Sequence, residues 1–298
     1  MRVFITGANG FVGKHLTRFF LEKGHHVTSL VRAEPKGKVL PPNTSVLVGE
    51  SMKPGKWQDA VASHDVLINL AGANIFKRWT EGYKSLMRES RILTTRNLVD
   101  AIPVDSGCVL LSTSAVGYYG FSGDEKLDET APPGSDFLAK LAQDWEAEAL
   151  RAREKGVRVV THRLGIVLGS DGGALPLMAL PFRFFVGGPV GSGKQWLSWI
   201  HVDDLCRAAF FVATNPIDGP VNFTAPEPVR NREVGAAIGK VLHRPSCLPV
   251  PGSIMKLILG EFGSVILEGQ RVIPRVLEAA GFSFTFPDIE SALRDLLR

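Results

Sequence analysis

The 298-residue chain contains only three cysteines, Cys108, Cys206 and Cys247, and no C-x-x-C pair. Because they are few and far apart, a disulfide framework and a structural zinc site are both disfavoured. No cluster of His, Cys, Asp and Glu shows a ligand spacing typical of a metal, and we expect no metal cofactor.

Long apolar runs are also missing. The longest one, residues 174–186, is interrupted by two prolines and an arginine, so we expect neither a membrane span nor a membrane partner. The 34 basic and 30 acidic residues form no stripe, which argues against nucleic-acid binding. The first predicted strand begins at Met1 or Arg2, which leaves no room for a signal peptide, and we expect a cytoplasmic protein.

What the chain does have is a glycine-rich turn between a strand and a helix. The apolar run Arg2–Thr6 breaks into residues 7–13, and apolar residues then recur at helical spacing up to Lys23-Gly24. In this context glycines bring the main chain close to a pyrophosphate, which the positive helix end attracts. The turn predicts a dinucleotide site, although a purely structural turn is the alternative. The predicted contacts are Gly7, Asn9, Gly10, Phe11, Val12 and Gly13.

The second predicted strand, His26–Val31, ends in Arg32. Folds of this kind often place a carboxylate here to bind the ribose 2′-hydroxyl of NAD, whereas a guanidinium suits the 2′-phosphate of NADP. We therefore predict NADP(H), with NAD less favoured. The alternative is a solvent-exposed arginine at the start of a loop.

Strand-like and helix-like segments alternate through the first half, which predicts an α/β fold with a doubly wound parallel sheet. We expect a Rossmann domain over 1–165, completed by about 197–225, and a smaller C-terminal α+β substrate lobe from 166–196 and 226–298. The fourth strand ends in small residues that allow a cofactor to approach. Its predicted contacts are Leu70, Ala71 and Gly72. Arg91, on the next helix, either reaches the cofactor phosphates or is solvated.

Together these motifs resemble the extended short-chain dehydrogenase/reductase family, the NAD(P)-dependent epimerase/dehydratase group, and within it an atypical "epimerase family" subgroup. The segments that carry the resemblance are Thr6–Gly13, Asn69–Gly72, Thr95–Leu98, Ser112–Ser114 with Tyr119-Gly120, Gly187–Gly193, Ile200–Asp204 and Gly269–Pro274. The resemblance covers nearly the whole chain. It implies a Rossmann domain, a nicotinamide cofactor and a substrate cleft roofed by the C-terminal part.

The sequence departs from this family at its catalytic tyrosine, which normally lies four residues before a lysine. Lys140 fits the lysine position and is predicted to hold the nicotinamide ribose, but Asp136 occupies the tyrosine position. The family's active serine or threonine aligns with Ala115 or with Ser114. A missing general acid/base removes about a hundred- to ten-thousand-fold in rate.

Three replacements remain open. Asp136 acts as a base, Tyr119 or Tyr118 delivers the proton beside Ser114, or no residue does and the protein senses its cofactor. Against these, Asp136 fits a helix N-cap and the tyrosines fit cleft walls. We predict an NADP(H)-binding, epimerase-like oxidoreductase for a small polar substrate, with Lys194 offering a charge if that substrate is anionic. A catalytically silent NADP(H) sensor is the alternative. We expect a monomer or a homodimer.

Overall fold

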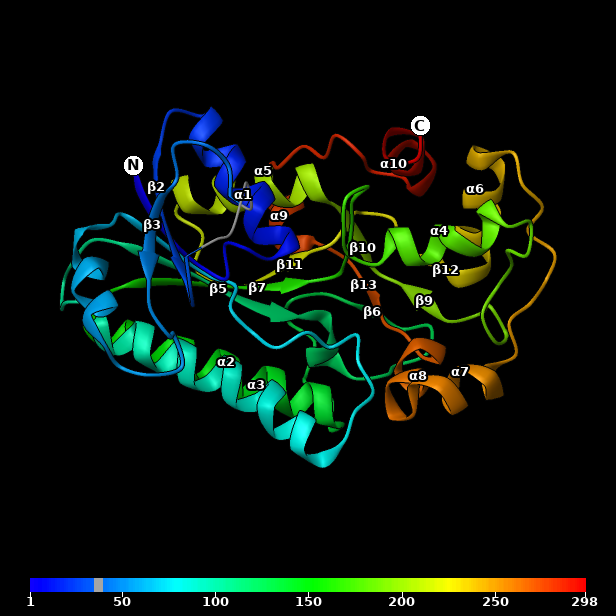
Figure 1. Ribbon diagram of the computed structural model, residues 1–298, viewed down its shortest axis with the longest axis horizontal. Helices are drawn as coiled ribbons and strands as arrows, with labels where there is room; N and C mark the ends of the chain where they lie inside the picture. The colour runs from blue at the N-terminus through cyan, green and yellow to red at the C-terminus, as the bar shows by residue number, and fades with distance from the viewer. Residues whose placement is uncertain (35–39) are drawn as a thin grey trace.

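A seven-stranded, wholly parallel sheet forms the centre of the computed structural model, which describes residues 1–34 and 40–298. The strand order is β11-β7-β5-β4-β1-β2-β3 (Figure 1). Successive strands are therefore added on one side of β1 up to β3 and on its other side from β4 onward, so the strand order reverses between β1 and β4. Ligands bind at such a reversal in doubly wound sheets. The predicted fold class is confirmed. The strands are β1 Arg2–Thr6, β2 His26–Val31, β3 Ser45–Val48, β4 Val66–Asn69, β5 Val109–Ala115, β7 Arg158–Leu164 and β11 Gly219–Phe223.

Helices cover both faces of this sheet (Figure 1). One face packs against α1 Phe11–Glu22, α5 Val202–Thr214 and α9 Arg275–Ala279. The other packs against α2 Glu81–Ala101, α3 Phe137–Leu150 and the short helices η1 Lys56–Ser63 and η3 Arg151–Lys155. The central strands are therefore buried on both sides, which explains their continuous apolar runs.

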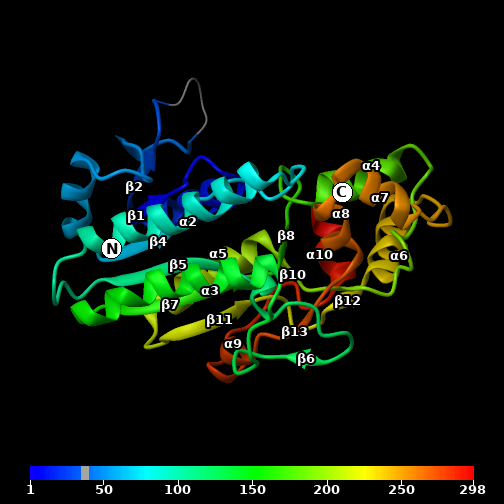
Figure 2. The same cartoon turned by 90° about the horizontal axis from the view of Figure 1, so that it is seen from below.

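A smaller lobe lies beyond the carboxyl ends of the strands (Figure 2). Its core surrounds Trp199, which is fully buried, with Phe182 and Leu293 close by. Its elements are β8 Ile166–Leu168, α4 Leu175–Arg183, β9 Trp196–Leu197, β10 Trp199–His201, β12 Val229–Arg230, α6 Asn231–Leu242, α7 Gly252–Leu259, α8 Glu261–Leu267 and α10 Ile289–Leu296. The short helix η2 Val116–Tyr119 and the strand pair β6 Lys126–Leu127 and β13 Arg271–Val272 link the two parts.

Helix boundaries follow local capping chemistry. Helix α2 begins at Glu81, because the Thr80 side chain accepts the N–H of Tyr83. Helix α3 ends at Leu150, and a 3-10 turn continues to Gly156, which takes a left-handed conformation with φ of 72°. Within the described ranges, no helix combines the length and apolar character needed to cross a bilayer.

Candidate functional site

The glycine turn, residues 7–13, leaves β1 at the point where the sheet order reverses. Gly7 has a φ of 72°, and a Cβ there would lie 2.9 Å from the nitrogen of Ala71. A Cβ on Gly13 would lie 2.4 Å from the carbonyl oxygen of Gly7, so α1 packs directly on the turn. Gly10 differs, because its nearest neighbour would be the Gly7 oxygen at 3.2 Å and it is exposed. The absent Gly10 side chain therefore leaves open space on the outer side of the turn.

The N-terminus of α1 faces that open space without a cap of its own. Gly10 is the N-cap, and within the described chain no side chain accepts a hydrogen bond from this end of the helix. The first turn of α1 also lacks an acidic residue. Free N–H groups and the positive end of the helix dipole favour an anion here. The turn therefore fits a pyrophosphate against bare main chain.

A buried hydrogen-bond network holds the loop after β4 beside the glycine turn. The Thr6 hydroxyl donates to Oδ1 of Asn69 at 2.8 Å and accepts the N–H groups of Leu70 and Ala71 at 3.2 Å each. The Asn69 amide donates in turn to the Thr95 hydroxyl on α2 at 2.8 Å. These side chains are fully buried, so a broken bond leaves an unsatisfied polar group. Residues 70–72 are thereby fixed next to Gly7, as a cofactor contact requires.

Arg91 lies under this loop and not in solvent. Its guanidinium donates to the carbonyl oxygens of Met87 at 3.0 Å and Ala73 at 3.1 Å, and a Cβ on Gly72 would lie 3.1 Å from its Cζ. Burial lowers the pKa of Arg91 to about 10, so it remains charged at neutral pH. It forms no ion pair with the residues that the structure describes. A half-buried cation without a counter-ion thus lies beside Gly72.

The other two predicted cofactor side chains are exposed. Arg32 follows β2, which pairs with β1 in the register Thr6–Leu30, so it shares the sheet edge with the glycine turn. Lys140 lies on the outer face of α3, whose buried face carries Leu141 and Trp145. Neither forms a salt bridge within residues 1–34 and 40–298. Both cofactor roles stay predictions.

Phe11 has a packing role that the sequence did not reveal. A Cβ on Gly169, Gly172 or Gly173 would lie 2.5, 2.5 or 2.8 Å from its ring, so these glycines form a recess for Phe11. The same segment contributes Asp171, whose Oδ1 lies 2.8 Å from Nε2 of His15. The segment after β8 therefore covers the start of α1. Its glycine spacing was the available signal, but nothing in the sequence paired it with Phe11.

A second group of buried polar residues lies at the carboxyl ends of β5, β7 and β11, and we name it the strand-end cluster. It consists of Ser114, Arg163 and Asn222 on these strands, Tyr119 on η2 and Glu146 on α3. The Ser114 hydroxyl donates to Oε1 of Glu146 at 2.6 Å, and Arg163 donates to both oxygens of Glu146 at 2.8 and 2.9 Å. Arg163 also donates to the Tyr119 hydroxyl at 2.9 Å, which itself donates to Oδ1 of Asn222 at 2.7 Å. Two predicted catalytic residues are thus tied into structure.

Electrostatics in this cluster favour a fixed protonation state. Burial by itself lowers the pKa of Arg163, but the ion pair with Glu146 outweighs it and raises the value. Tyr119 is 2% exposed, and burial raises its pKa to about 12. A phenol with that pKa keeps its proton at neutral pH. Glu146 and Arg163 were missed from sequence, although charged residues within an apolar helix face and a central strand are a recognisable signal.

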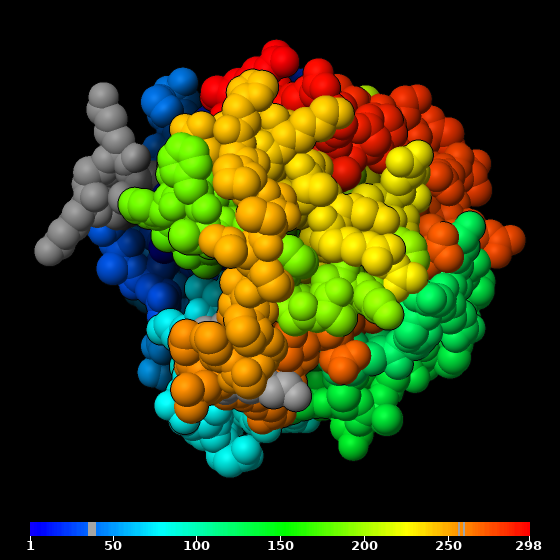
Figure 3. Space-filling view, turned by 90° about the vertical axis from the view of Figure 1, so that its right-hand side faces the viewer, coloured from blue at the N-terminus to red at the C-terminus, as the bar shows by residue number. Residues whose placement is uncertain are grey.

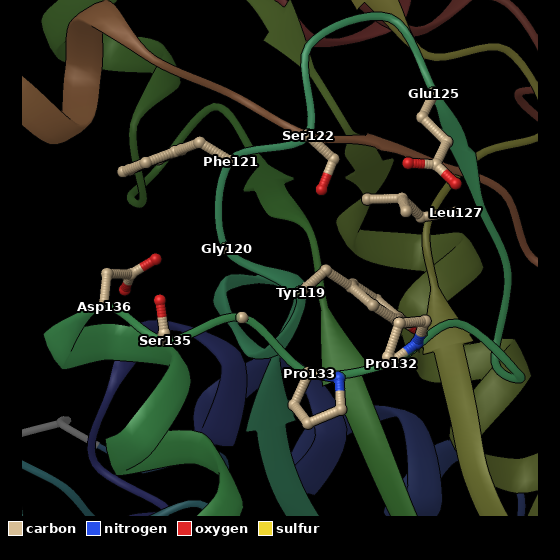
Figure 4. A pocket seen from close by; sticks show the side chains of 11 residues that line it. Tyr119, Gly120, Phe121, Ser122, Glu125, Leu127, Pro132, Pro133, Ser135 and Asp136 are labelled. Carbon is tan, nitrogen blue, oxygen red and sulfur yellow. The ribbon is translucent and has the colours of Figure 1, made fainter.

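Asp136 begins α3 as its N-cap, with Oδ1 accepting the N–H of Ala139 at 3.0 Å. Together with Tyr119 it borders a cavity of about 340 Å³, and Figure 4 shows the two on the wall formed by η2 and the start of α3. The residues that line this cavity include none of the glycine turn and none of residues 70–72. The candidate catalytic and cofactor groups therefore do not share this cavity.

Comparison with known proteins identifies the family of this chain. Residues 3–224 match the family model described as "NAD dependent epimerase/dehydratase family". The chain belongs to this family. Residues 250–296 match a second model, a domain of unknown function named DUF1731.

Relatives match over the full chain. An Arabidopsis thaliana protein named "Epimerase family protein SDR39U1 homolog, chloroplastic" is 42% identical over 306 residues, covering 100% of this chain and 87% of the relative. The Bacillus subtilis "Epimerase family protein YfhF" is 40% identical over 302 residues, covering 100% and 98%. The predicted resemblance to the NAD(P)-dependent epimerase/dehydratase group and its "epimerase family" proteins is confirmed.

Solved structures agree in fold. The human epimerase family protein SDR39U1, crystallised with NADPH, superimposes with a TM-score of 0.88 at 34% identity, covering 99% of both chains. A Thermus thermophilus UDP-glucose 4-epimerase in complex with NAD gives a TM-score of 0.80 at 20% identity, covering 100% and 98%. The second likeness shows the fold alone. The family's nucleotide-binding fold is therefore present here.

Proposed function

We propose that this chain is an NADP(H)-binding, epimerase-like oxidoreductase that acts on a small polar substrate. The observation that carries the proposal is the glycine turn, where Gly10 leaves space in front of the uncapped N-terminus of α1. The NADPH in the structure of the human relative supports the choice of cofactor.

Each cofactor contact has a physical reason. The main chain of residues 7–13 would bind the pyrophosphate through N–H groups, and Arg32 would pair with the 2′-phosphate. Residues 70–72 would lie against the nicotinamide half, with the uncompensated charge of Arg91 underneath them. The bound cofactor supplies hydride transfer. The chain's own residues position it and exclude water from it.

Proton transfer is the less determined part of the proposal. Ser114 and Tyr119 both donate their hydroxyl protons within the strand-end cluster. Asp136 uses Oδ1 as a cap, while Oδ2 has no hydrogen-bond partner among the described residues. We therefore assign the acid–base role to Asp136, with Lys140 one helical turn further along α3.

The internal hydrogen bonds of Ser114 and Tyr119 favour a second candidate function, that of a catalytically silent NADP(H) sensor. With Ser114 and Tyr119 bonded internally and no Tyr-x-x-x-Lys tyrosine, the fold retains its binding groups while its usual acid–base groups are absent. Cofactor turnover separates the two functions. Oxidation of NADPH, or reduction of NADP, with any member of a metabolite panel supports the enzyme, and turnover that falls in Asp136→Asn assigns the acid–base role. Tight cofactor retention with no turnover across the panel supports the sensor.

Cofactor preference is tested by titrating NADPH and NADH into the parent, Arg32→Ala and Arg232→Ala. Arg232 is an exposed arginine on α6 and serves as the matched control. Losing one charge-assisted hydrogen bond, about 1.5–3 kcal/mol, weakens NADPH binding by about ten- to a hundredfold and leaves NADH binding unchanged. Equal NADPH affinity in the parent and Arg32→Ala would overturn the phosphate role.

A further inference from the structure

Large apolar side chains protrude from three neighbouring segments of the smaller lobe and its border. Their exposed fractions reach 70% for Phe184 and 57% for Phe185 at the end of α4, and 79% for Leu257 and 63% for Ile258 on α7. We name as the apolar rim these four residues together with Leu177 on α4 and Phe76 in the loop before α2. Such an exposed set exceeds the scattered apolar residues that a soluble surface normally carries.

The rim is continuous across the fold. The N–H of Leu248 donates to the carbonyl of Gly187 at 3.2 Å, which ties the end of α4 to the segment that enters α7. Further along, the Phe76 ring contacts Phe262 of α8 edge-on, with ring centroids 5.6 Å apart. In Figure 3 the α4 segment, the strip leading to α7, and α7 with α8 follow one another down one side of the molecule. The segments that carry these exposed side chains therefore adjoin one another on this side of the molecule.

The charged side chains within the rim segments are basic, and the nearby carboxylate of Glu261, at the start of α8, is paired with Lys84. The sequence contains no Asp or Glu between Asp65 and Glu81, between Asp171 and Asp203, or between Glu233 and Glu261. These are the three segments that build the rim. Their exposed basic residues include Arg78, Arg183 and Lys194, and none of these forms a salt bridge within the described residues. The rim is thus apolar and basic at once.

Phe185 adds an observation of its own. Its φ is 61°, a left-handed conformation that is an outlier for a bulky residue. The ring nevertheless stays largely exposed, with the Arg244 guanidinium stacked 4.3 Å from its centroid. The main chain is therefore strained at a position where an aromatic ring beside a cation faces outward.

We propose that the apolar rim docks this protein on the surface of an anionic lipid bilayer. Apolar side chains enter the boundary between headgroups and acyl chains, while Lys and Arg pair with lipid phosphates, as interfacial proteins do. A second copy of the chain fits less well, because an isologous contact would set one predominantly basic face against another. Docking of this kind needs no spanning helix, and it revises the sequence-based expectation that no membrane partner exists.

Co-sedimentation of the full chain with vesicles tests the proposal. The parent is expected to bind vesicles of phosphatidylglycerol and phosphatidylcholine, to bind pure phosphatidylcholine weakly, and to dissociate as salt rises. The paired substitutions Leu257→Glu and Ile258→Glu should reduce binding at least tenfold. Arg183→Gln should reduce it about fivefold, which corresponds to the loss of ~1 kcal/mol per surface charge.

Val104→Glu is the matched control, because Val104 is 68% exposed and lies between α2 and β5, at the opposite edge of the sheet. It should bind vesicles like the parent, and unchanged thermal unfolding shows that each variant is folded. The proposal is overturned if the parent does not bind phosphatidylglycerol vesicles or if the Leu257/Ile258 variant binds as well as the parent. It is also overturned if the parent is a dimer that this variant converts to a monomer while vesicle binding is absent from both.

Discussion

Two polar regions lie at the same edge of the sheet and differ in whether their hydrogen-bonding groups have partners. At the glycine turn, α1 begins without a side-chain cap, and Arg91 lies nearby without a carboxylate partner among the described residues. In the strand-end cluster, Ser114 and Tyr119 donate to Glu146 and Asn222, and Arg163 pairs with Glu146. Groups left without partners indicate a ligand, whereas groups bonded to one another indicate structure. The comparison therefore favours nucleotide binding more strongly than it favours acid–base chemistry by Ser114 or Tyr119.

Breaking the buried ion pair should give the largest effect. Arg163→Met leaves Glu146 charged and buried, and it should lower the free energy of unfolding by about 3–5 kcal/mol in urea denaturation. Arg88→Met removes a half-exposed arginine from its pair with Asp144 and should cost less than about 1 kcal/mol. The double variant with Glu146→Met should regain most of the loss. A single variant as stable as Arg88→Met would show that the cluster is not structural.

The pH dependence of stability extends the comparison to a buried histidine, which lies on the faces of β5 and β7 opposite to the strand-end cluster. His162 pairs with Thr113 in register, its Nε2 lies 2.8 Å from the Thr113 hydroxyl, and burial lowers its pKa to about 3. Between pH about 3 and 6.5, His162 is protonated in the unfolded chain and neutral in the folded chain. Stability should therefore fall as pH decreases below about 6.5, by about 2–4 kcal/mol once pH approaches 3.

Urea unfolding of the parent and His162→Gln over this range measures the effect of the histidine. The variant should show a shallower decline with falling pH. Burial also lowers the pKa of His201, so part of the dependence should remain. Parallel curves for the two proteins would contradict the assignment to His162.

Gly10→Val tests the glycine turn, the region of the comparison whose polar groups are left without partners. Gly10 has a φ of −76°, which valine can adopt, but an added Cβ would lie 3.2 Å from the Gly7 oxygen and valine is a poor N-cap, so stability should fall by about 1 kcal/mol. The added side chain should block one or two charge-assisted hydrogen bonds to a pyrophosphate, about 1.5–3 kcal/mol each, and weaken NADPH binding at least tenfold. Gly82→Val, on α2 with open space around it, should bind NADPH like the parent. Fluorescence titration measures both, and undiminished affinity in Gly10→Val would refute the pyrophosphate site.

The smallest effect on stability is expected at Asp136, which uses one carboxylate oxygen as a helix cap and leaves the other without a hydrogen-bond partner among the described residues. Because asparagine caps a helix as well as aspartate does, Asp136→Asn should change stability by less than about 0.5 kcal/mol, whereas Asp136→Ala should cost about 1 kcal/mol. Thermal unfolding measures this cap. Turnover of any substrate that is found should fall by about a hundredfold or more in Asp136→Asn if the carboxylate is the base. Equal turnover in Asp136→Asn and the parent would leave Asp136 as a cap alone.

Local patterns predicted a large part of this molecule. The strand, turn and helix of residues 2–22 follow from β-branched content, glycine spacing and helical periodicity, which all act within one segment. Asp136 was already recognisable as a candidate N-cap, and the structure shows that bond. These predictions succeeded because each depends on neighbours only a few residues away.

Other features depend on contacts between distant segments, and no local pattern encodes them. Phe11 and the glycines at 169–173 meet only because the segment after β8 crosses α1. Tyr119 and Asn222 are 103 residues apart, yet η2, which follows β5, brings Tyr119 to the sheet edge where β11 ends. Lys140 shows the converse, since its spacing fits the family's lysine while α3 turns it outward.

The sequence by itself determined the parallel α/β fold and the glycine turn between β1 and α1, because hydrophobic patterning and short-range stereochemistry indicate both. Only the tertiary structure decided which polar groups are left for a ligand. Ser114 and Tyr119 looked like reacting groups until packing brought Glu146, Arg163 and Asn222 within hydrogen-bonding distance. A buried hydroxyl or phenol must find a partner, and the fold chooses that partner.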